Sequence, residues 1–375
     1  MQFKDVIGNS DLKERLINMV QNGRVGHSIM FVEQDGCGAL PMALAFIQYL
    51  ACRNKVSDGD SCGECPVCKK ISKGMHPDVH IVFPVNATSK SGSDKKPVSD
   101  HFLAQWRELV EENPYFLEKE LYQKIKIEDK VGVISVAEAK EVLSKLSLKS
   151  YEGYNKYMLI YLPERMNTEA ANRLLKIVEE PTEGTYFIFV SHSPENVLGT
   201  IRSRSQVVRV HPVEASVLSP YLQRKYSLNE QEAMSFARAS NGSVGEAIAA
   251  VASVTEGVQY LSEAVAMFEA ASHKNLLQLL KNNDAIVELG REKQKGFCIY
   301  AQELLRKILM LQKGIPQISN ATPTELPHIE RLSKVVNQES IPLWVSALER
   351  TREAVEGNVN AKIAFCNLAN YLYMG

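Results

Sequence analysis

Four cysteines form the strongest chemical pattern in this sequence. Cys52, Cys62, Cys65 and Cys68 follow one another at intervals of nine, two and two residues. In a reducing compartment such crowding is typical of metal binding rather than of disulfides. Four sulfur ligands complete a tetrahedral coordination sphere and leave no position for water, so the spacing predicts a structural zinc ion. An iron–sulfur cluster and a loop of unligated thiols stay open as alternatives.

A glycine-containing loop that begins at Glu33 has the outline of a phosphate-binding loop without its chemistry. A working loop uses glycines so that backbone N–H groups can approach the phosphates, a lysine for the outer phosphates, and a Ser or Thr for magnesium. Gly36 and Gly38 are present. Ala39, however, stands at the lysine position, Leu40 stands at the hydroxyl position, and Glu33 adds negative charge. We therefore expect no ATP in this chain. Feeble residual nucleotide binding is the alternative, because a helix N-terminus alone can still attract an anion.

The composition defines the class of protein. The chain has 375 residues, of which 45% are hydrophobic and 23% charged, as in a soluble globular protein of two or three domains. The net charge of −1 gives no global basic field for tight, autonomous binding to DNA. No apolar run approaches the length that spans a bilayer, and the start of the chain has no apolar signal-peptide core. We therefore expect a cytoplasmic protein without a membrane segment.

The N-terminal half alternates short apolar runs with helical patterns. Each run has the length of a strand, and most are rich in β-branched or aromatic residues. The runs lie at residues 29–32, 79–83, 157–162, 186–190 and 207–210. Helical patterns lie between them at 39–50, 136–146 and 168–180, the last with Asn167 as its cap. The alternation predicts an α/β domain over residues 1–212, with a parallel sheet covered by helices on both faces.

Two segments interrupt this alternation. The cysteines lie in the first, residues 52–68, which we expect to be a zinc module. The second is a polar insertion at about 85–130. Its stretch from Asn86 to Lys96 lacks aromatic residues and predicts a mobile loop, and a short amphipathic helix around Trp106 follows. We expect a solvated elaboration rather than a partner contact and assign the insertion no function.

The pattern after Pro212 is helical throughout. Three short helices at 219–225, 230–239 and 244–251 predict a small three-helix unit over residues 213–255. Further helical patterns lie at 276–280, 297–311, 329–336, 343–355 and 361–373. A helical tail of this size must pack against itself or against partner chains. Broad apolar faces suit an assembly, so we expect residues 256–375 to form an all-α collar for oligomerisation, with packing within the tail itself as the alternative.

A series of short motifs runs along the chain. They are Phe3, Val6-Ile7-Gly8, Gly23 to His27, the four cysteines, His76-Pro77-Asp78, Met166-Asn167, Ala170 to Asn172, Leu174 to Lys176, Glu179-Glu180-Pro181, Thr200 to Gln206, Asn358 and Asn360. Together they resemble the delta-prime subunits of bacterial DNA polymerase III, which belong to the AAA+ clamp-loader family. The resemblance covers nearly the whole chain and is densest before the helical tail. It implies an AAA+ α/β domain with an inserted zinc module, a helical lid and a helical collar.

The resemblance also implies an arginine finger, which is an arginine that reaches the ATP of a neighbouring subunit. Arg204, flanked by Ser203 and Ser205, matches that position, and Ser205 stands where the family usually has cysteine. A forked, permanently charged guanidinium can stabilise charge on a transferring phosphoryl group. Two alternatives stay open. Arg204 could form a simple salt bridge within its own chain, and the nearby Arg202 could act in its place, at best as a helper.

The positions that a motor subunit of this family uses around its own ATP are altered together. Tyr161 and Leu162 match the two acidic positions that hold magnesium. Glu164 is the nearest acid, two residues late. Ser191-His192 stands at the position of the first sensor, a polar residue that probes the phosphate in the family's motors. Gly245 stands at the position of the arginine that forms the second sensor.

The resemblance therefore implies a stator, a subunit that neither binds nor hydrolyses ATP and is no enzyme by itself. Within the DNA polymerase III holoenzyme it would join motor subunits and the clamp-opening subunit in a hetero-pentamer that loads the sliding clamp onto primed DNA. It would touch the clamp indirectly, and DNA weakly, through the phosphate backbone only. An active motor ATPase of the same family and a stand-alone zinc-binding nucleic-acid module stay open as alternatives.

Overall fold

The computed structural model of the chain describes residues 1–56, 59–86, 97–127, 130–152, 155–315, 321 and 324–375. The chain divides into two compact units, Met1–Val251 and Ala252–Gly375. Apart from Asn86, the predicted mobile loop up to Lys96 lies outside the described residues. The finer division into residues 1–212, 213–255 and 256–375 stays a prediction.

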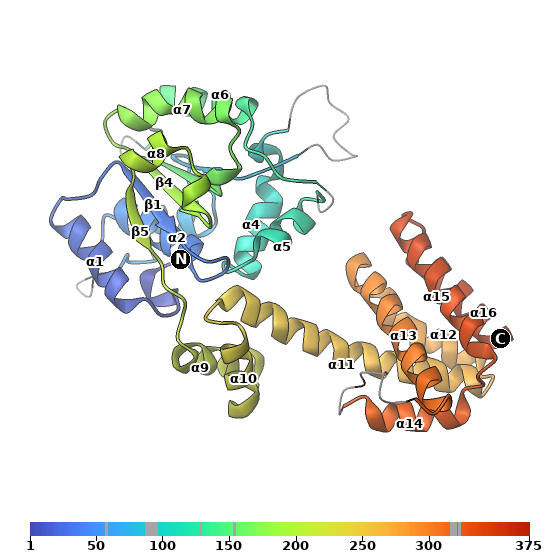
Figure 1. Ribbon diagram of the computed structural model, residues 1–375. Coiled ribbons are helices and arrows are strands. Elements are labelled where there is room, and N and C mark those ends of the chain that lie inside the picture. Colours follow the sequence, from blue (N-terminus) through green and yellow to red (C-terminus); the bar gives the residue numbers. More distant parts are fainter. Residues whose placement is uncertain (57–58, 87–96, 128–129, 153–154, 316–320, 322–323) are drawn as a thin grey trace. The chain divides into compact units, whose positions relative to one another are not determined.

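The first unit is built on a parallel sheet of five strands, as the alternating pattern predicted (Figure 1). The strands are β1 (Ser28–Val32), β2 (Val79–Val82), β3 (Lys156–Tyr161), β4 (Thr185–Ser191) and β5 (Gln206–Arg209), in the spatial order β2-β3-β4-β1-β5. β1 lies inside the sheet, where Met30 is opposite both Phe189 of β4 and Val207 of β5. Because the strands are parallel, the loops that follow β1, β3 and β4 meet at one edge of the sheet.

Helices cover both faces of this sheet. They are α1 (Ser10–Gln21), α2 (Ala39–Ala51), α6 (Val136–Ser147), α7 (Thr168–Glu179) and α8 (Gly199–Arg204), with short 3-10 turns η1 (Phe3–Asp5), η3 (Pro163–Arg165) and η4 (Pro194–Asn196). Consecutive strand residues point to opposite faces, so Phe31 packs in the core that contains α2 and Met30 in the core that contains α7. The predicted cap is confirmed, since Asn167 Oδ1 accepts the Ala170 N–H at 2.8 Å.

The cysteine segment and the insertion follow α2 and β2. The segment ends in α3 (Pro66–Ser72), and the insertion contains η2 (Ser99–Phe102), α4 (Leu103–Glu112) and α5 (Glu118–Lys124). Trp106 of α4 is 1% exposed and stacks on Phe83 with ring centroids 4.6 Å apart. The expectation of a solvated elaboration is therefore wrong for this part of the insertion, because its aromatic side chains complete the core of the sheet.

A separate apolar cluster joins α9 (Ala215–Tyr226), α10 (Glu230–Ala239) and the start of α11 (Val244–Ser272). We call these three segments, up to Val251, the α9–α11 cluster; Leu218, Leu222 and Ala247 lie in its core. The sequence predicted a short third helix that ends at residue 251, whereas α11 continues unbroken. Residues 252–255 are all exposed, so they show no apolar periodicity although the helix runs through them.

The second unit contains helices and no strand within its described residues. Beyond α11 these are α12 (Leu276–Val287), α13 (Arg291–Gln312), α14 (Leu326–Val335), α15 (Ser340–Glu356) and α16 (Ala361–Met374). Phe268 and Trp344 stack 5.7 Å apart in its core. Among the described residues of the chain, no helix is long and apolar enough to cross a membrane.

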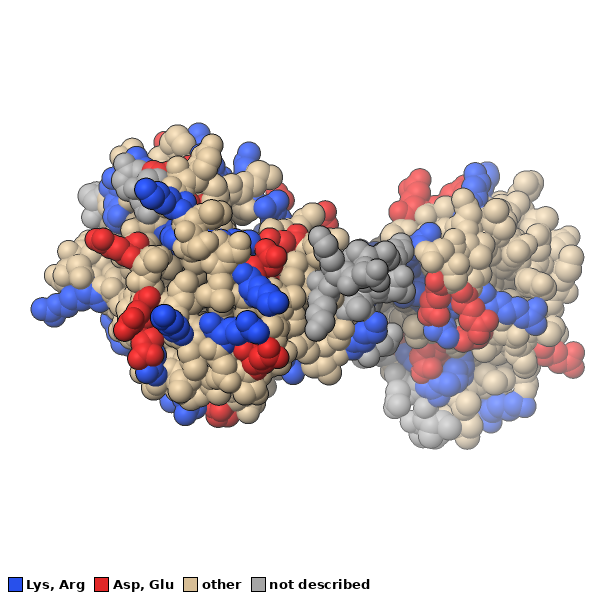
Figure 2. Space-filling view, turned by 90° about the horizontal axis from the view of Figure 1, so that it is seen from above, with Lys and Arg blue, Asp and Glu red and all other residues tan. Residues whose placement is uncertain are grey.

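Charged side chains of both signs are interspersed on the visible face of the described residues (Figure 2). On the face shown in Figure 2, Lys and Arg lie among Asp and Glu rather than in one basic field. This distribution agrees with the net charge of −1. It gives that face no broad positive potential toward a nucleic acid.

Candidate functional site

The loop of residues 33–38, which we call the phosphate-like loop, leaves the carboxyl end of β1 and enters α2. Gly36 and Gly38 have φ values of 77° and 114°, a region that favours glycine. The Glu33 side chain is buried, and its Oε2 accepts hydrogen bonds from the N–H groups of Gly38 (2.5 Å) and Ala39 (2.7 Å). N–H groups at the start of a helix after such a loop are the donors that bind phosphate. The chain's own carboxylate therefore lies where an anion would bind.

His192 completes a buried polar cluster beside Glu33. Its Nε2 lies 3.6 Å from Glu33 Oε1 and 3.6 Å from Asp35 Oδ1. Burial alone would lower the pKa of His192, but the two carboxylates outweigh burial and raise that pKa above its ordinary value of 6.5. Burial also raises the pKa of Asp35. The sequence analysis did not predict this pairing. Its signal was an acid, Glu33, just after the apolar run 29–32 and a histidine, His192, just after the run 186–190.

We expect this cluster to make stability depend on pH. Because the folded-state pKa of His192 is raised, its contribution is fully present below the unfolded value of 6.5 and is lost as pH rises through the folded pKa. The groups that face it are Glu33, Asp35, Glu164 and Tyr161. From about pH 6 to about pH 8, the unfolding free energy should therefore fall more in the native chain than in a His192→Gln variant.

Chemical denaturation of both proteins at the two pH values measures this difference. The other titrating groups are common to both chains, so their contributions largely cancel in the comparison. An equal fall in the native chain and the variant would remove His192 from the pH dependence.

The end of β3 supplies no acid to the phosphate-like loop at the two positions the family's motors use. Tyr161 and Leu162 stand there, 1% and 0% exposed. Glu164 instead binds the end of β4, where its Oε1 accepts the His192 N–H at 2.8 Å and its Oε2 accepts the Ser191 hydroxyl at 2.9 Å. Both oxygens are engaged in these bonds, so this carboxylate holds two strand ends together.

Arg204 is the last residue of α8, and its side chain is 36% exposed. Its Nη2 lies 2.8 Å from Glu179 Oε1 at the end of α7, and its Nη1 donates to the Thr200 carbonyl at 3.2 Å. The salt bridge that the sequence left open is therefore present. An exposed ion pair contributes only about 1 kcal/mol or less, so it is readily exchanged for another anion. A guanidinium has about five N–H donors, of which these contacts use two.

The residues around Arg204 differ in their placement. Ser205 is buried, and its Oγ lies 2.8 Å from the Oγ of Ser28 on β1. Ser203 is exposed, and its hydroxyl donates to the Thr200 carbonyl near the start of its own helix. Arg202 donates to the Pro194 carbonyl at 3.2 Å. Ser205 thus anchors the end of α8 to the sheet beside an exposed arginine.

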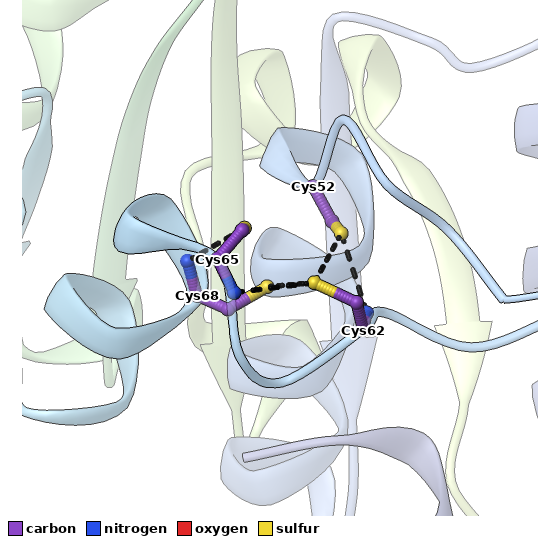
Figure 3. A group of neighbouring side chains, drawn as sticks. All are labelled: Cys52, Cys62, Cys65 and Cys68. Carbon is purple, nitrogen blue, oxygen red and sulfur yellow. Dashed lines mark hydrogen bonds between the residues drawn. The ribbon is translucent and has the colours of Figure 1, made fainter.

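The four predicted ligand cysteines converge on one point (Figure 3). Cys52 follows α2, Cys62 and Cys65 precede α3, and Cys68 lies within α3. All four Sγ atoms lie within 4.8 Å of one another. The Sγ of Cys62 is 3.6 Å from that of Cys52 and 3.9 Å from that of Cys68. With Zn–S bonds of about 2.3 Å, a tetrahedron has edges of about 3.8 Å, so this group could hold a zinc ion.

Backbone N–H groups support thiolates in this group. The N–H groups of Cys62, Cys65 and Cys68 each donate to the Sγ of the cysteine before, at 3.3, 3.4 and 3.4 Å. Bonds from the Cys65 and Glu64 N–H groups lower the pKa of Cys62 to about 6, whereas burial raises the pKa of Cys52 and of Cys68. Sulfur separations near 4 Å leave little space for the iron and sulfide atoms of a cluster between the thiolates. A single tetrahedral ion therefore fits better than an iron–sulfur cluster.

The cysteine loop also holds the N-terminus of the chain. Asp60 Oδ1 accepts the Phe3 N–H at 3.1 Å. The Met1 ammonium donates to Gln48 Oε1 at 3.0 Å, and the Gln48 amide donates to the Ser61 hydroxyl at 3.0 Å. Order in the cysteine loop is thus coupled to order at the start of the first unit.

The fold and the site together define a parallel α/β domain whose phosphate-like loop carries Ala39 and Leu40 where a working loop has a lysine and a hydroxyl residue. A family model described as DNA polymerase III, delta subunit, matches residues 8–214. The match covers more than half of the chain, and the chain belongs to this family.

Individual relatives confirm the resemblance to delta-prime subunits. The chain is 27% identical over 207 residues to the DNA polymerase III subunit delta' of Bacillus subtilis (strain 168), covering 55% of this chain and 49% of that one. It is 25% identical over 236 residues to the subunit delta' of Escherichia coli (strain K12), covering 63% and 58%. The match thus spans about half the length of these curated relatives.

Solved structures add little to this comparison. A DNA polymerase III gamma subunit-related protein from Thermotoga maritima is 16% identical, over 97% of this chain and 99% of that one, with a TM-score of 0.34. A TM-score this low supports no conclusion about the function of this chain.

Proposed function

We propose that this chain is a stator of the bacterial DNA polymerase III clamp loader, a subunit that neither binds nor hydrolyses ATP. The observation that carries the proposal is the Glu33 carboxylate on the Gly38 and Ala39 N–H groups. A nucleotide would have to displace this buried, hydrogen-bonded carboxylate before its phosphates could reach the loop. Ala39 and Leu40 offer neither an ammonium nor a hydroxyl in return. These features favour a stator over an active motor of the same family.

We expect calorimetric titration of the isolated chain with Mg·ATP to show no saturable binding. A Glu33→Ala variant is the matched control, because it frees the two N–H groups while the lysine and hydroxyl stay missing. It should bind ATP weakly at most, since the strongest phosphate and metal contacts are still absent. Stoichiometric binding of ATP by the native chain would contradict the proposal.

In this proposal the chain acts on a partner's nucleotide through Arg204. It joins ATP-binding motor subunits and the clamp-opening subunit in a hetero-pentamer, and Arg204 stabilises charge on the phosphoryl group that is transferred in a neighbouring site. Two observations support this role: the exposure of the Arg204 side chain and the anchoring of α8 by Ser205. Arg202, which bonds a carbonyl of its own chain, is a helper at best.

We assign a separate role to each of three parts of the chain. Residues 1–212 form the AAA+ domain, residues 213–255 its lid, and residues 256–375 the collar that joins the ring. The chain acts in the cytoplasm and contacts the sliding clamp through its neighbours. It contacts primed DNA weakly, at backbone phosphates, because its charge is close to neutral. The same charge argues against a stand-alone zinc-binding nucleic-acid module.

The four cysteines hold one structural zinc ion in this proposal. Four sulfur ligands leave no open coordination position, so the ion stabilises the loop and does no chemistry on a substrate. Through Asp60 it also stabilises the first residues of the chain.

A further inference from the structure

The insertion between β2 and β3 reaches the phosphate-like loop with one short segment, residues 115–118. Tyr115, Phe116 and Leu117 are 3%, 3% and 1% exposed. Phe116 packs edge-on against Trp106 and Tyr161, with ring centroids 5.3 and 5.6 Å away. This segment is therefore anchored in the core of the sheet through Phe116.

The side chains of this segment occupy the space next to the loop's glycines. A Cβ atom on Gly36 would lie 2.8 Å from Leu117 Cδ2, closer than real Cβ contacts. One on Gly38 would lie 3.1 Å from Tyr115 Cε1. The space beside the loop is thus filled by the protein itself.

The same segment contacts the α9–α11 cluster. The Tyr115 side chain belongs to the apolar core of that cluster, together with Leu218 and Ala247. A Cβ atom on Gly245 would lie 2.3 Å from the Tyr115 carbonyl oxygen and 2.9 Å from Leu117 Cδ2. Gly245, at the position of the second sensor's arginine, therefore has no space for any side chain.

Hydrogen bonds also link the phosphate-like loop, the insertion and the α9–α11 cluster, and we call this place of contact the joint. The Gly245 N–H donates to the Gly36 carbonyl at 3.0 Å, and the Ser243 hydroxyl donates to the Asp35 carbonyl at 2.8 Å. The Glu118 N–H donates to Asp35 Oδ2 at 3.1 Å. The loop, the insertion and the α9–α11 cluster are thus bonded to one another at one place.

We propose that residues 115–118 are an internal plug that fills the nucleotide position and locks the α9–α11 cluster onto the phosphate-like loop. Where a bound nucleotide holds such elements together, the joint is released when the nucleotide changes. Here the chain's own side chains hold the joint, so it stays closed. The inference builds on the proposed absence of nucleotide, and it gives the insertion a role.

Hydrogen exchange of the full chain, comparing Leu117→Ala with Leu121→Ala, tests the plug. Leu117 lies between Gly36 and Gly245. Leu121, in the same helix region and 0% exposed, packs in the sheet core and is the matched control. Leu117→Ala should speed amide exchange in α10 and in residues 244–251 at least about tenfold, because a cavity at the joint favours local opening. Leu121→Ala should loosen α5 without that effect.

A second, more conservative variant keeps the proposal testable if Leu117→Ala does not fold. Tyr115→Phe leaves the Ile7 N–H, which bonds the Tyr115 hydroxyl at 2.7 Å, without its acceptor, and should speed exchange of the same amides several-fold. Unchanged exchange of those amides in Leu117→Ala and Tyr115→Phe, or an equal increase in Leu121→Ala, would overturn the plug. Because no nucleotide enters the measurement, its failure is distinguishable from failure of the proposed function, which the ATP titration decides.

Discussion

In a reconstituted clamp loader, Arg204→Ala is expected to leave the assembly intact and to remove most of the ATP turnover at one neighbouring site. An arginine supplied in trans typically accelerates phosphoryl transfer by about 10³- to 10⁵-fold. The substitution removes one exposed ion pair with Glu179 and one bond to the Thr200 carbonyl, so the fold of the chain should be unaffected. Single-turnover hydrolysis, with gel filtration of the complex, measures both quantities.

Two further variants sharpen this result. Arg204→Lys keeps the charge but loses the fork, so we expect most of the loss to persist. Arg202→Ala removes a bond to the Pro194 carbonyl and should have a small effect. Native turnover with Arg204→Ala would take Arg204 out of the mechanism and leave it a structural role, through the salt bridge to Glu179 and the bond to the Thr200 carbonyl.

Replacing Cys62 with Ser is expected to remove the metal and to lower the stability of the chain. Zinc content should fall from about one ion per chain to near zero, because a tetrahedral structural site needs all four thiolates. The melting temperature should fall by about 5 °C or more, since metal binding at such a site contributes to folding free energy. Elemental analysis and calorimetry measure the two effects. Cys62 is only half-buried, so the substitution itself leaves the core packing in place.

Cys366→Ser is the matched control for this experiment. Cys366 is also half-buried but lies in α16, outside the cysteine group. This variant should keep its zinc and its melting temperature. Full zinc occupancy in Cys62→Ser would show that the four-cysteine site has been misidentified.

Local patterns were sufficient to predict the sheet and its best-defined helix. The apolar runs at 29–32 and 186–190 lie in β1 and β4, because strands that are buried on both faces are continuous apolar runs. Asn167 marked the start of α7 because a capping side chain acts within one helical turn. The cysteines were equally local, since three of the four lie within seven residues and their spacing alone brings the thiolates together.

The features that were missed depend on segments far apart in the chain. The sequence showed the charge of Glu33 but not that its carboxylate would turn back onto Gly38 and Ala39, next to His192. The sequence predicted a solvated elaboration around Trp106, because the aromatic partners of Trp106, Phe83 and Tyr161, lie in other elements. Periodicity describes one element at a time, so it cannot show which distant side chains fill a site.

Labelling of the reconstituted loader with a photoreactive ATP analogue tests the central claim most directly, because it reports which subunits hold nucleotide while turnover is running. We expect label on the partner motor subunits and none on this chain, together with turnover that depends on Arg204. Label on this chain at the level of the motor subunits would contradict the claim, because the buried Glu33 carboxylate would then not have closed the site.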